Sequence, residues 1–317
     1  MRNWLGRGMR AAQSAADRAD LWPAGALAWL VFIGWLPLLL VIAPPDAEGL
    51  EAFGVSLYLA ESFPVNVALL AGGLVVGFAA ACLLASAAEL VIHDAMAPGD
   101  RHALSATRTL SAFAVVLVCS VPVVAALGLV LLSGFAVAPS EYMSAELGTP
   151  VLLRILLRLV PQLVILAAAL MAAQAIAGTA LRIGFANRGR PATAALSAAV
   201  RLIRRRAPGL VGIAAVGLIV DTLIVAIEYG ILRVLWQPIG LGLGDGLESR
   251  PETILLLLGF IAVWLGLLLA AGALHVAISI WWAAEVGSGR EASAPMAGAP
   301  PAAAMGPLAD RESGGAH

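Results

Sequence analysis

The amino-acid sequence predicts an all-α integral membrane protein built as a six-helix bundle. Of its 317 residues, 61% are hydrophobic and only 12% are charged, and the mean hydropathy is +0.94. Soluble domains are about half apolar and about a quarter charged. The composition therefore excludes a soluble domain, and it also excludes disordered chains and nucleic-acid binders, which need more charge. Because lipid cannot hydrogen-bond backbone groups, apolar runs as long as these must be helices.

Six apolar runs are long enough to cross a bilayer, which takes about 20 residues. We predict spans at residues 24–43, 65–88, 112–136, 151–180, 210–235 and 254–284. The first run is longer than the apolar region of a signal peptide, so we interpret it as an uncleaved span. Residues 1–23 read as a cytoplasmic amphipathic helix. Residues 286–317, rich in Gly, Ala and Pro, read as a disordered cytoplasmic tail.

The arginines predict the orientation of the spans. Fifteen of the 19 Arg lie in residues 1–23, 89–109, 182–207 and 285–317, which alternate with acidic connections. Positive charge is retained on the cytoplasmic side of the membrane. We therefore expect a multi-pass protein of the cell (inner) membrane with both termini in the cytoplasm.

A short sequence repeat precedes two of the spans. Ala103–Ala106 (Ala-Leu-Ser-Ala) recurs as Ala195–Ala198, and the N-terminal segment is a looser third version. After the second copy, Arg201, Arg204 and Arg205 lie opposite apolar residues at helical spacing, as in a helix that contacts anionic headgroups. The pattern suggests three two-helix repeats, each preceded by an amphipathic interfacial helix. Chance similarity among Ala/Leu/Ser-rich helices is the competing interpretation.

The segment Ala195–Gly209, an Ala-Leu-Ser helix with Arg followed by a break and a long span, resembles the six-helix membrane domain fused to some glycerophosphodiester phosphodiesterases. It is also similar to related uncharacterised prokaryotic membrane families. The likeness covers residues 95–285. It implies a six-helix membrane fold and no catalytic residue, because no segment here resembles the soluble phosphodiesterase domain.

Ionisable residues inside predicted spans are costly and are functional candidates by default. They include Arg154 and Arg158 in the fourth span and Glu228 in the fifth. At 1.5 Å per residue, Arg158 and Glu228 both lie roughly 12 Å below the outer boundary. We interpret them as a structural ion pair. The alternatives are an anion-binding pocket walled by Arg154 and Arg158, or arginines that snorkel to the headgroups.

Two further ionisable residues lie deeper. Asp221 is either a proton-coupling carboxylate or a residue hydrogen-bonded to Gln162 or Gln174 of the fourth span, and we favour the second interpretation. His275 is interpreted as a polar group that packs helices together. Small residues repeat at every fourth position of the second span (Gly73 to Ala85) and the sixth (Ala262 to Ala270), which is typical of packing faces.

Chemical motifs are missing: there is no phosphate-binding loop, zinc-protease motif or nucleophile elbow. We predict no catalytic, cofactor-binding or metal-binding residue. Glu89 and His93 share a helix face near Asp94, Asp100 and His102, which we interpret as a solvated cytoplasmic cap rather than a metal site.

These observations favour a non-enzymatic membrane scaffold or lipid-organising component. Its expected partner is a bilayer with anionic inner-leaflet headgroups, with no nucleic acid. A membrane-protein partner or a homo-oligomer is compatible with the sequence. A small transporter or permease that uses the intramembrane Arg, Asp and Glu residues is the first alternative, and an accessory subunit of a membrane enzyme is the second.

Overall fold

The computed structural model describes residues 2–43, 52, 55–56, 58–96, 105–143, 151–186, 191–244 and 251–291. The regular elements in these ranges are all helices, so the predicted all-α class is confirmed. The predicted tail at 286–317 lies mostly outside the described residues, and α10 continues to Glu291.

Five helices are long and apolar enough to cross a membrane. They are α5 (Val65–Met96), α6 (Ala106–Tyr142), α8 (Val160–Ala186), α9 (Ala192–Gly244) and α10 (Pro251–Glu291). Most extend beyond the spans predicted from composition. The chain is therefore a multi-pass membrane protein.

The first predicted span, residues 24–43, is broken rather than continuous. It comprises α2 (Trp22–Trp29), the π-helix η2 (Leu30–Gly34) and α3 (Leu36–Ile42), and the two halves are bent by 53° at the break. Pro37 at the start of α3 lacks a backbone N–H, and it clashes with a straight continuation of the helix. If the bent pair counts as one span, six helices cross the membrane as predicted.

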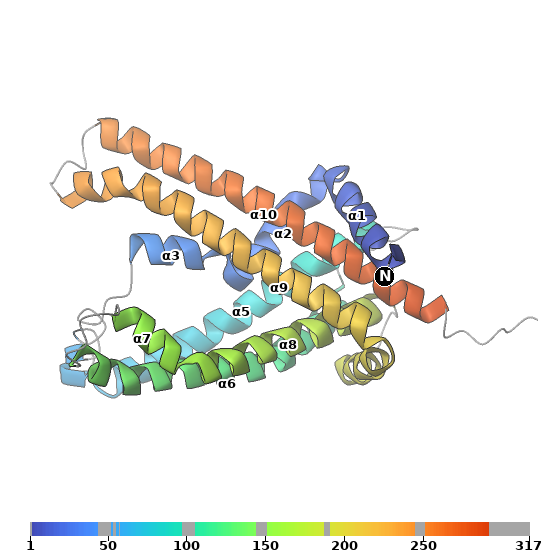
Figure 1. The fold of residues 1–317 in the computed structure, drawn as a ribbon, viewed down its shortest axis with the longest axis horizontal. Helices are drawn as coiled ribbons and strands as arrows, with labels where there is room; N and C mark the ends of the chain where they lie inside the picture. Colours follow the sequence, from blue (N-terminus) through green and yellow to red (C-terminus); the bar gives the residue numbers. More distant parts are fainter. Residues whose placement is uncertain are drawn as a thin grey trace, which may run out of the picture.

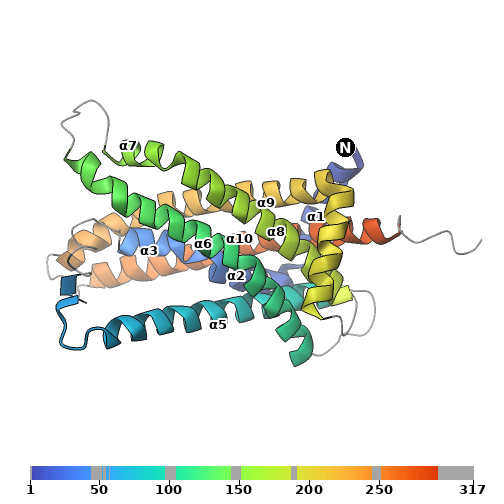
Figure 2. The same cartoon turned by 90° about the horizontal axis from the view of Figure 1, so that it is seen from below.

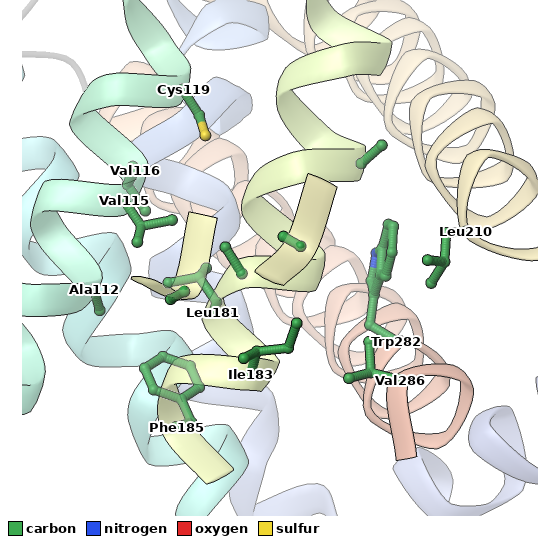
Figure 3. Packing of buried hydrophobic residues seen from close by; sticks show 14 of the residues in the cluster. Ala112, Val115, Val116, Cys119, Leu181, Ile183, Phe185, Leu210, Trp282 and Val286 are labelled. Carbon is green, nitrogen blue, oxygen red and sulfur yellow. The ribbon is translucent and has the colours of Figure 1, made fainter. Parts of the chain in front are cut away.

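The spans form a closed ring. Each span packs against the next along the chain, in the order α2, α5, α6, α8, α9 and α10, and α10 packs back against α2 (Figures 1 and 2). We call the end of the ring that carries α1, the start of α9 and the last turns of α10 the basic end. The largest hydrophobic cluster lies near this end and joins α5, α6, α8, α9 and α10 around Leu181, Leu210 and Trp282 (Figure 3).

Helices are present at two of the three places where amphipathic helices were predicted. The helix α1 (Arg2–Ala16) packs along the basic end of α10. The first part of α9 is set off from the rest by non-helical backbone angles at Arg206, and it crosses the bundle (Figure 2). The third expected helix is not separate, because α6 begins at Ala106 and runs directly into its span; residues 97–104, including part of that repeat, lie outside the described ranges.

The closest approach of two helices uses glycines that the small-residue pattern did not single out. A Cβ on Gly25 of α2 would overlap the carbonyl oxygen of Gly272 in α10, and a Cβ on Gly272 would overlap the backbone at Trp22 and Ala26. Gly73 and Gly266, members of the predicted packing faces, have open space around them instead. These glycines therefore do not pack inside the bundle, and a packing face toward a second copy of the chain stays a prediction.

Candidate functional site

A buried polar network joins three helices on the basic-end side of the ring. Glu89 of α5 accepts hydrogen bonds from Arg182 Nη2 of α8 (2.8 Å) and from Ser279 Oγ of α10 (3.0 and 3.2 Å). His275 Nε2 of α10 lies 2.8 Å from Glu89 Oε1. Glu89, Arg182 and Ser279 are all buried. The carboxylate is therefore fully used by partners from two neighbouring helices, which stabilises this charge inside the membrane.

The network corrects the interpretation of Glu89 as part of a solvated cap. Glu89 points into the bundle, whereas Asp94 of the same helix binds Arg108 of α6 at 2.7 Å. His93 stacks on Phe185. Within the described ranges no group of three His, Cys, Asp or Glu could hold a metal ion. Asp100 and His102 lie outside those ranges.

Asp221 of α9 lies next to the Glu89 network. Its Oδ2 accepts a long hydrogen bond from Gln174 Nε2 of α8 (3.4 Å), as one sequence interpretation expected. Its Oδ1 is buried and has no hydrogen-bond partner among the described residues. Asp221 also interacts electrostatically with His275, so His275 lies between two carboxylates from different helices.

Glu228 lies two turns beyond Asp221 on α9, about 10 Å further from the basic end at 1.5 Å per residue. Its side chain is 1% exposed, and neither carboxylate oxygen has a hydrogen-bond partner in the described part of the chain. An ionised carboxylate without a partner in an apolar interior is very costly, so Glu228 must hold a proton or a cation.

Two tryptophans with buried indole N–H groups lie in the same region. Trp29 of α2 is buried beside Asp221, and Trp264 of α10 belongs to both apolar clusters that flank Glu228 along α9. Neither Nε1 atom makes a hydrogen bond of good geometry among the described residues, although the Trp29 indole interacts with the Asp221 carboxylate. Unsatisfied buried donors and acceptors are rare in folded proteins. Here they extend over about two helical turns, from Glu228 to the level of Asp221 and Trp29.

This level is also where the first span breaks. Trp29 is the last residue of α2, and the π-helix follows it directly. Gly34 makes room for the indole, because a Cβ there would overlap the Trp29 ring. Short π-helical segments and interrupted spans frequently occur at functional sites in membrane proteins. We call Trp29, Asp221, Glu228 and Trp264 the break site.

The predicted ion pair between Arg158 and Glu228 is wrong. Arg158 Nε lies 2.5 Å from Glu141 Oε1 of α6, and Arg154 Nε lies 2.9 Å from the other oxygen of the same carboxylate. Both arginines belong to the short helix α7 (Val151–Arg158), which ends before α8 begins. The helix α7 packs against α6 rather than α9. Arg154 is buried and Arg158 is largely exposed.

At the basic end, Arg201, Arg204 and Arg205 are exposed on the first part of α9, as the sequence predicts for headgroup contacts. Its opposite side, with Ala195 and Ala199, is buried in the protein core rather than in lipid.

The N-terminal helix is attached at the same end. Arg7 binds Glu285 of α10 at 2.5 Å, and the Trp4 indole donates to the carbonyl oxygen of Gly209 just after the bend in α9 (3.3 Å). Trp4 also packs on Trp281, with ring centroids 4.5 Å apart. These contacts hold α1 on the bundle and leave Leu5 and Met9 exposed.

Sequence reasoning found Asp221, Glu228 and His275, misinterpreted Glu89 as solvated, and missed Arg182, Trp29 and Trp264. Two signals could have found the break site. Pro37 interrupts an otherwise uniform apolar run, and the tryptophans lie within spans rather than at their ends, where aromatic belts occur.

The fold and these buried polar groups define a polytopic all-α membrane protein with an ionisable interior. No family model, curated protein or solved structure matches the chain. The resemblance to phosphodiesterase-associated membrane domains therefore stays a prediction.

Proposed function

We propose that this chain is a secondary transporter coupled to protons, the first alternative to the scaffold that the sequence favours. The supporting observation is that Asp221 and Glu228, next to a broken span, carry buried carboxylate oxygens with no hydrogen-bond partner in the described part of the chain. A scaffold gains nothing from such groups, because each one costs stability. A transporter needs groups that take up and release an ion during its cycle.

The two polar regions suit different tasks. The Glu89 network has its hydrogen bonds filled and ties α5, α8 and α10 together, so it closes the path toward the basic end. The break site holds the unfilled groups. Between them His275 contacts Glu89 and faces Asp221, which provides a proton-transfer step between the two regions. The 53° bend supplies a hinge about which α3 can move relative to α9, against which it packs.

Replacement of Asp221 by Asn tests this proposal. Purified protein is reconstituted in proteoliposomes, a pH gradient is imposed, and currents are measured on a solid-supported membrane. Mixtures of small cations, of small anions and of neutral solutes are added in turn as substrate pools. We expect at least one of these pools to induce a current. Asp221→Asn keeps the side-chain size but removes the titratable group, so the currents should fall at least about tenfold, which corresponds to about 1.4 kcal/mol.

The matched control is Glu252→Gln, an exposed acid at the start of α10, which should keep its currents. Unfolding midpoints must show that both variants are folded. Wild-type protein without current for every pool, or full currents in Asp221→Asn, would reject proton-coupled transport.

A second function, organisation of anionic lipid, is favoured by the exposed Arg201, Arg204 and Arg205 on the bent part of α9. Such a helix attracts anionic headgroups by about 1 kcal/mol for each basic residue near the surface. This function is compatible with transport, since the two involve different ends of the molecule.

Replacement of these three arginines by Gln should release bound lipid. We expect at least about a tenfold loss of co-purified anionic phospholipid, measured by mass spectrometry of the detergent-extracted protein, because three favourable charge interactions are removed. Zwitterionic lipid should be unchanged. Equal loss of both lipid classes would argue for a general packing defect, and no loss would reject a headgroup role for the arginines.

A further inference from the structure

We propose that the break site binds a hydrophobic organic cation, such as a substituted ammonium, in exchange for protons. This inference rests on the proposed transport function and assigns its substrate class. It follows from three properties of the site: its charge, its apolar surroundings and its aromatic donors.

The carboxylates of the site have no cationic side chain of their own among the described residues. Among the described residues no charged group acts on Glu228, and Asp221 interacts with one titratable residue, His275, together with the neutral Gln174 and Trp29. His275 is shared with Glu89, whose own charge is matched by Arg182. Two carboxylates thus lie in the interior with no cation of their own. Protons neutralise the carboxylates when no substrate is bound, and a positively charged ligand can displace these protons.

The surroundings select an organic ion over a small inorganic one. Apolar side chains of the cluster at the break, including Ile33, Ile224 and Leu268, surround this level of the ring. Hard cations such as Ca²⁺ require six to eight oxygen ligands. The break site has only three carboxylate oxygens without partners. A cation with hydrocarbon substituents loses little hydration and gains apolar contact.

The tryptophans supply further recognition. Indole faces are the strongest aromatic partners of cations, and such contacts reach about 2 kcal/mol or more when they are desolvated. Trp29 and Trp264 come from α2 and α10 and share a cluster with Ile224 and Val225 of α9, so indoles from two helices lie beside the part of α9 between Asp221 and Glu228. The same groups would repel an anion of equal size.

Exchange follows from charge balance. When a monocation binds, a carboxylic acid of the site loses its O–H proton to water on the open side, and the carboxylate then faces the bound positive charge. Release of the cation on the other side returns a proton to the carboxylate. Lower pH should therefore weaken cation binding, because protons compete for the same oxygens.

Calorimetric titration with two ions of the same shape tests the charge selectivity of the purified, detergent-solubilised protein. Tetraphenylphosphonium should bind saturably, and tetraphenylborate, its anionic counterpart, should not. Binding of tetraphenylphosphonium should release protons, measured by repeating the titration in buffers of different ionisation enthalpy. Saturable binding of both ions, or of neither, would overturn the assignment.

Variants locate the binding to the break site. Glu228→Gln should weaken binding of tetraphenylphosphonium at least about tenfold, or about 1.4 kcal/mol. Trp264→Leu should weaken it several-fold, whereas Glu252→Gln should leave it within about twofold. If Glu228→Gln proves unstable, Trp264→Leu and the proton-release titration still decide the question. Unchanged affinity in both break-site variants places the cation elsewhere and overturns the proposal.

The outcomes also separate this inference from transport itself. Currents for anionic or neutral pools with no binding of tetraphenylphosphonium would leave a transporter with a different substrate class. Saturable, proton-releasing binding without current for any pool would leave an organic-cation site in a protein that does not transport.

Discussion

Gly272→Val should destabilise the protein by about 3 kcal/mol or more, at the upper end of the range for overpacked cores. The reason is the contact between α2 and α10, where a Cβ at Gly272 would overlap backbone atoms of Trp22 and Ala26. Backbone cannot rotate away as a flexible side chain can, so the two helices must separate. Reversible unfolding in mixed micelles measures the change.

Gly266→Val is the matched control for this prediction. It makes the same substitution in the same helix, but no atom lies within 4 Å of the added Cβ. It should therefore change the free energy of unfolding by less than about 0.5 kcal/mol, as surface substitutions usually do. Equal effects of the two variants would contradict close packing at Gly25 and Gly272. The larger effect should also impair transport, because separation of α2 from α10 displaces Trp29 from Trp264.

Arg182→Leu should cost about 3–5 kcal/mol of stability, since it leaves the buried Glu89 carboxylate without its only full positive charge. His275 and Ser279 remain as hydrogen-bonding partners but do not replace the guanidinium. The same unfolding measurement applies. Arg201→Leu, on the exposed face of α9, should cost less than about 0.5 kcal/mol.

The double variant Glu89→Leu/Arg182→Leu distinguishes a charge effect from a packing effect. Replacing a buried ion pair with apolar residues of similar volume is often neutral. We therefore expect the double variant to regain most of the stability lost in Arg182→Leu. A double variant as unstable as the single one would mean that Arg182 acts through its packing. Restored stability without transport would support the role of the Glu89 network in closing the path.

How far the sequence predicted the structure differs between elements. The spans at 65–88, 112–136, 210–235 and 254–284 each lie within one long helix, because the need for apolar residues in lipid is a local property of the chain. Residues 24–43 were predicted as one straight span, yet they bend after Gly34. The tertiary structure decides that α3 packs against α9 beyond Pro37.

For the ionisable residues, too, the sequence predicted position along the helix but not the partner. Depth along a helix is readable from the sequence, so Arg158 and Glu228 were placed at similar levels. Which residues meet depends on the rotation of each helix about its axis and on its neighbours. Arg158 turns toward Glu141, and Glu228 is left without a partner. Glu89 was taken as solvated because it lies near a helix end, and only the packing of α8 and α10 around it brings Arg182 and His275 to its carboxylate.

The sequence by itself thus determined that this is an all-α membrane protein and where its long apolar helices lie. These properties depend on the transfer of each residue from water and on a fixed rise of 1.5 Å per residue. The tertiary structure decided which charges are paired, where two helices touch through glycine and where a span breaks. Those features depend on contacts between segments far apart in the chain, which no local pattern encodes.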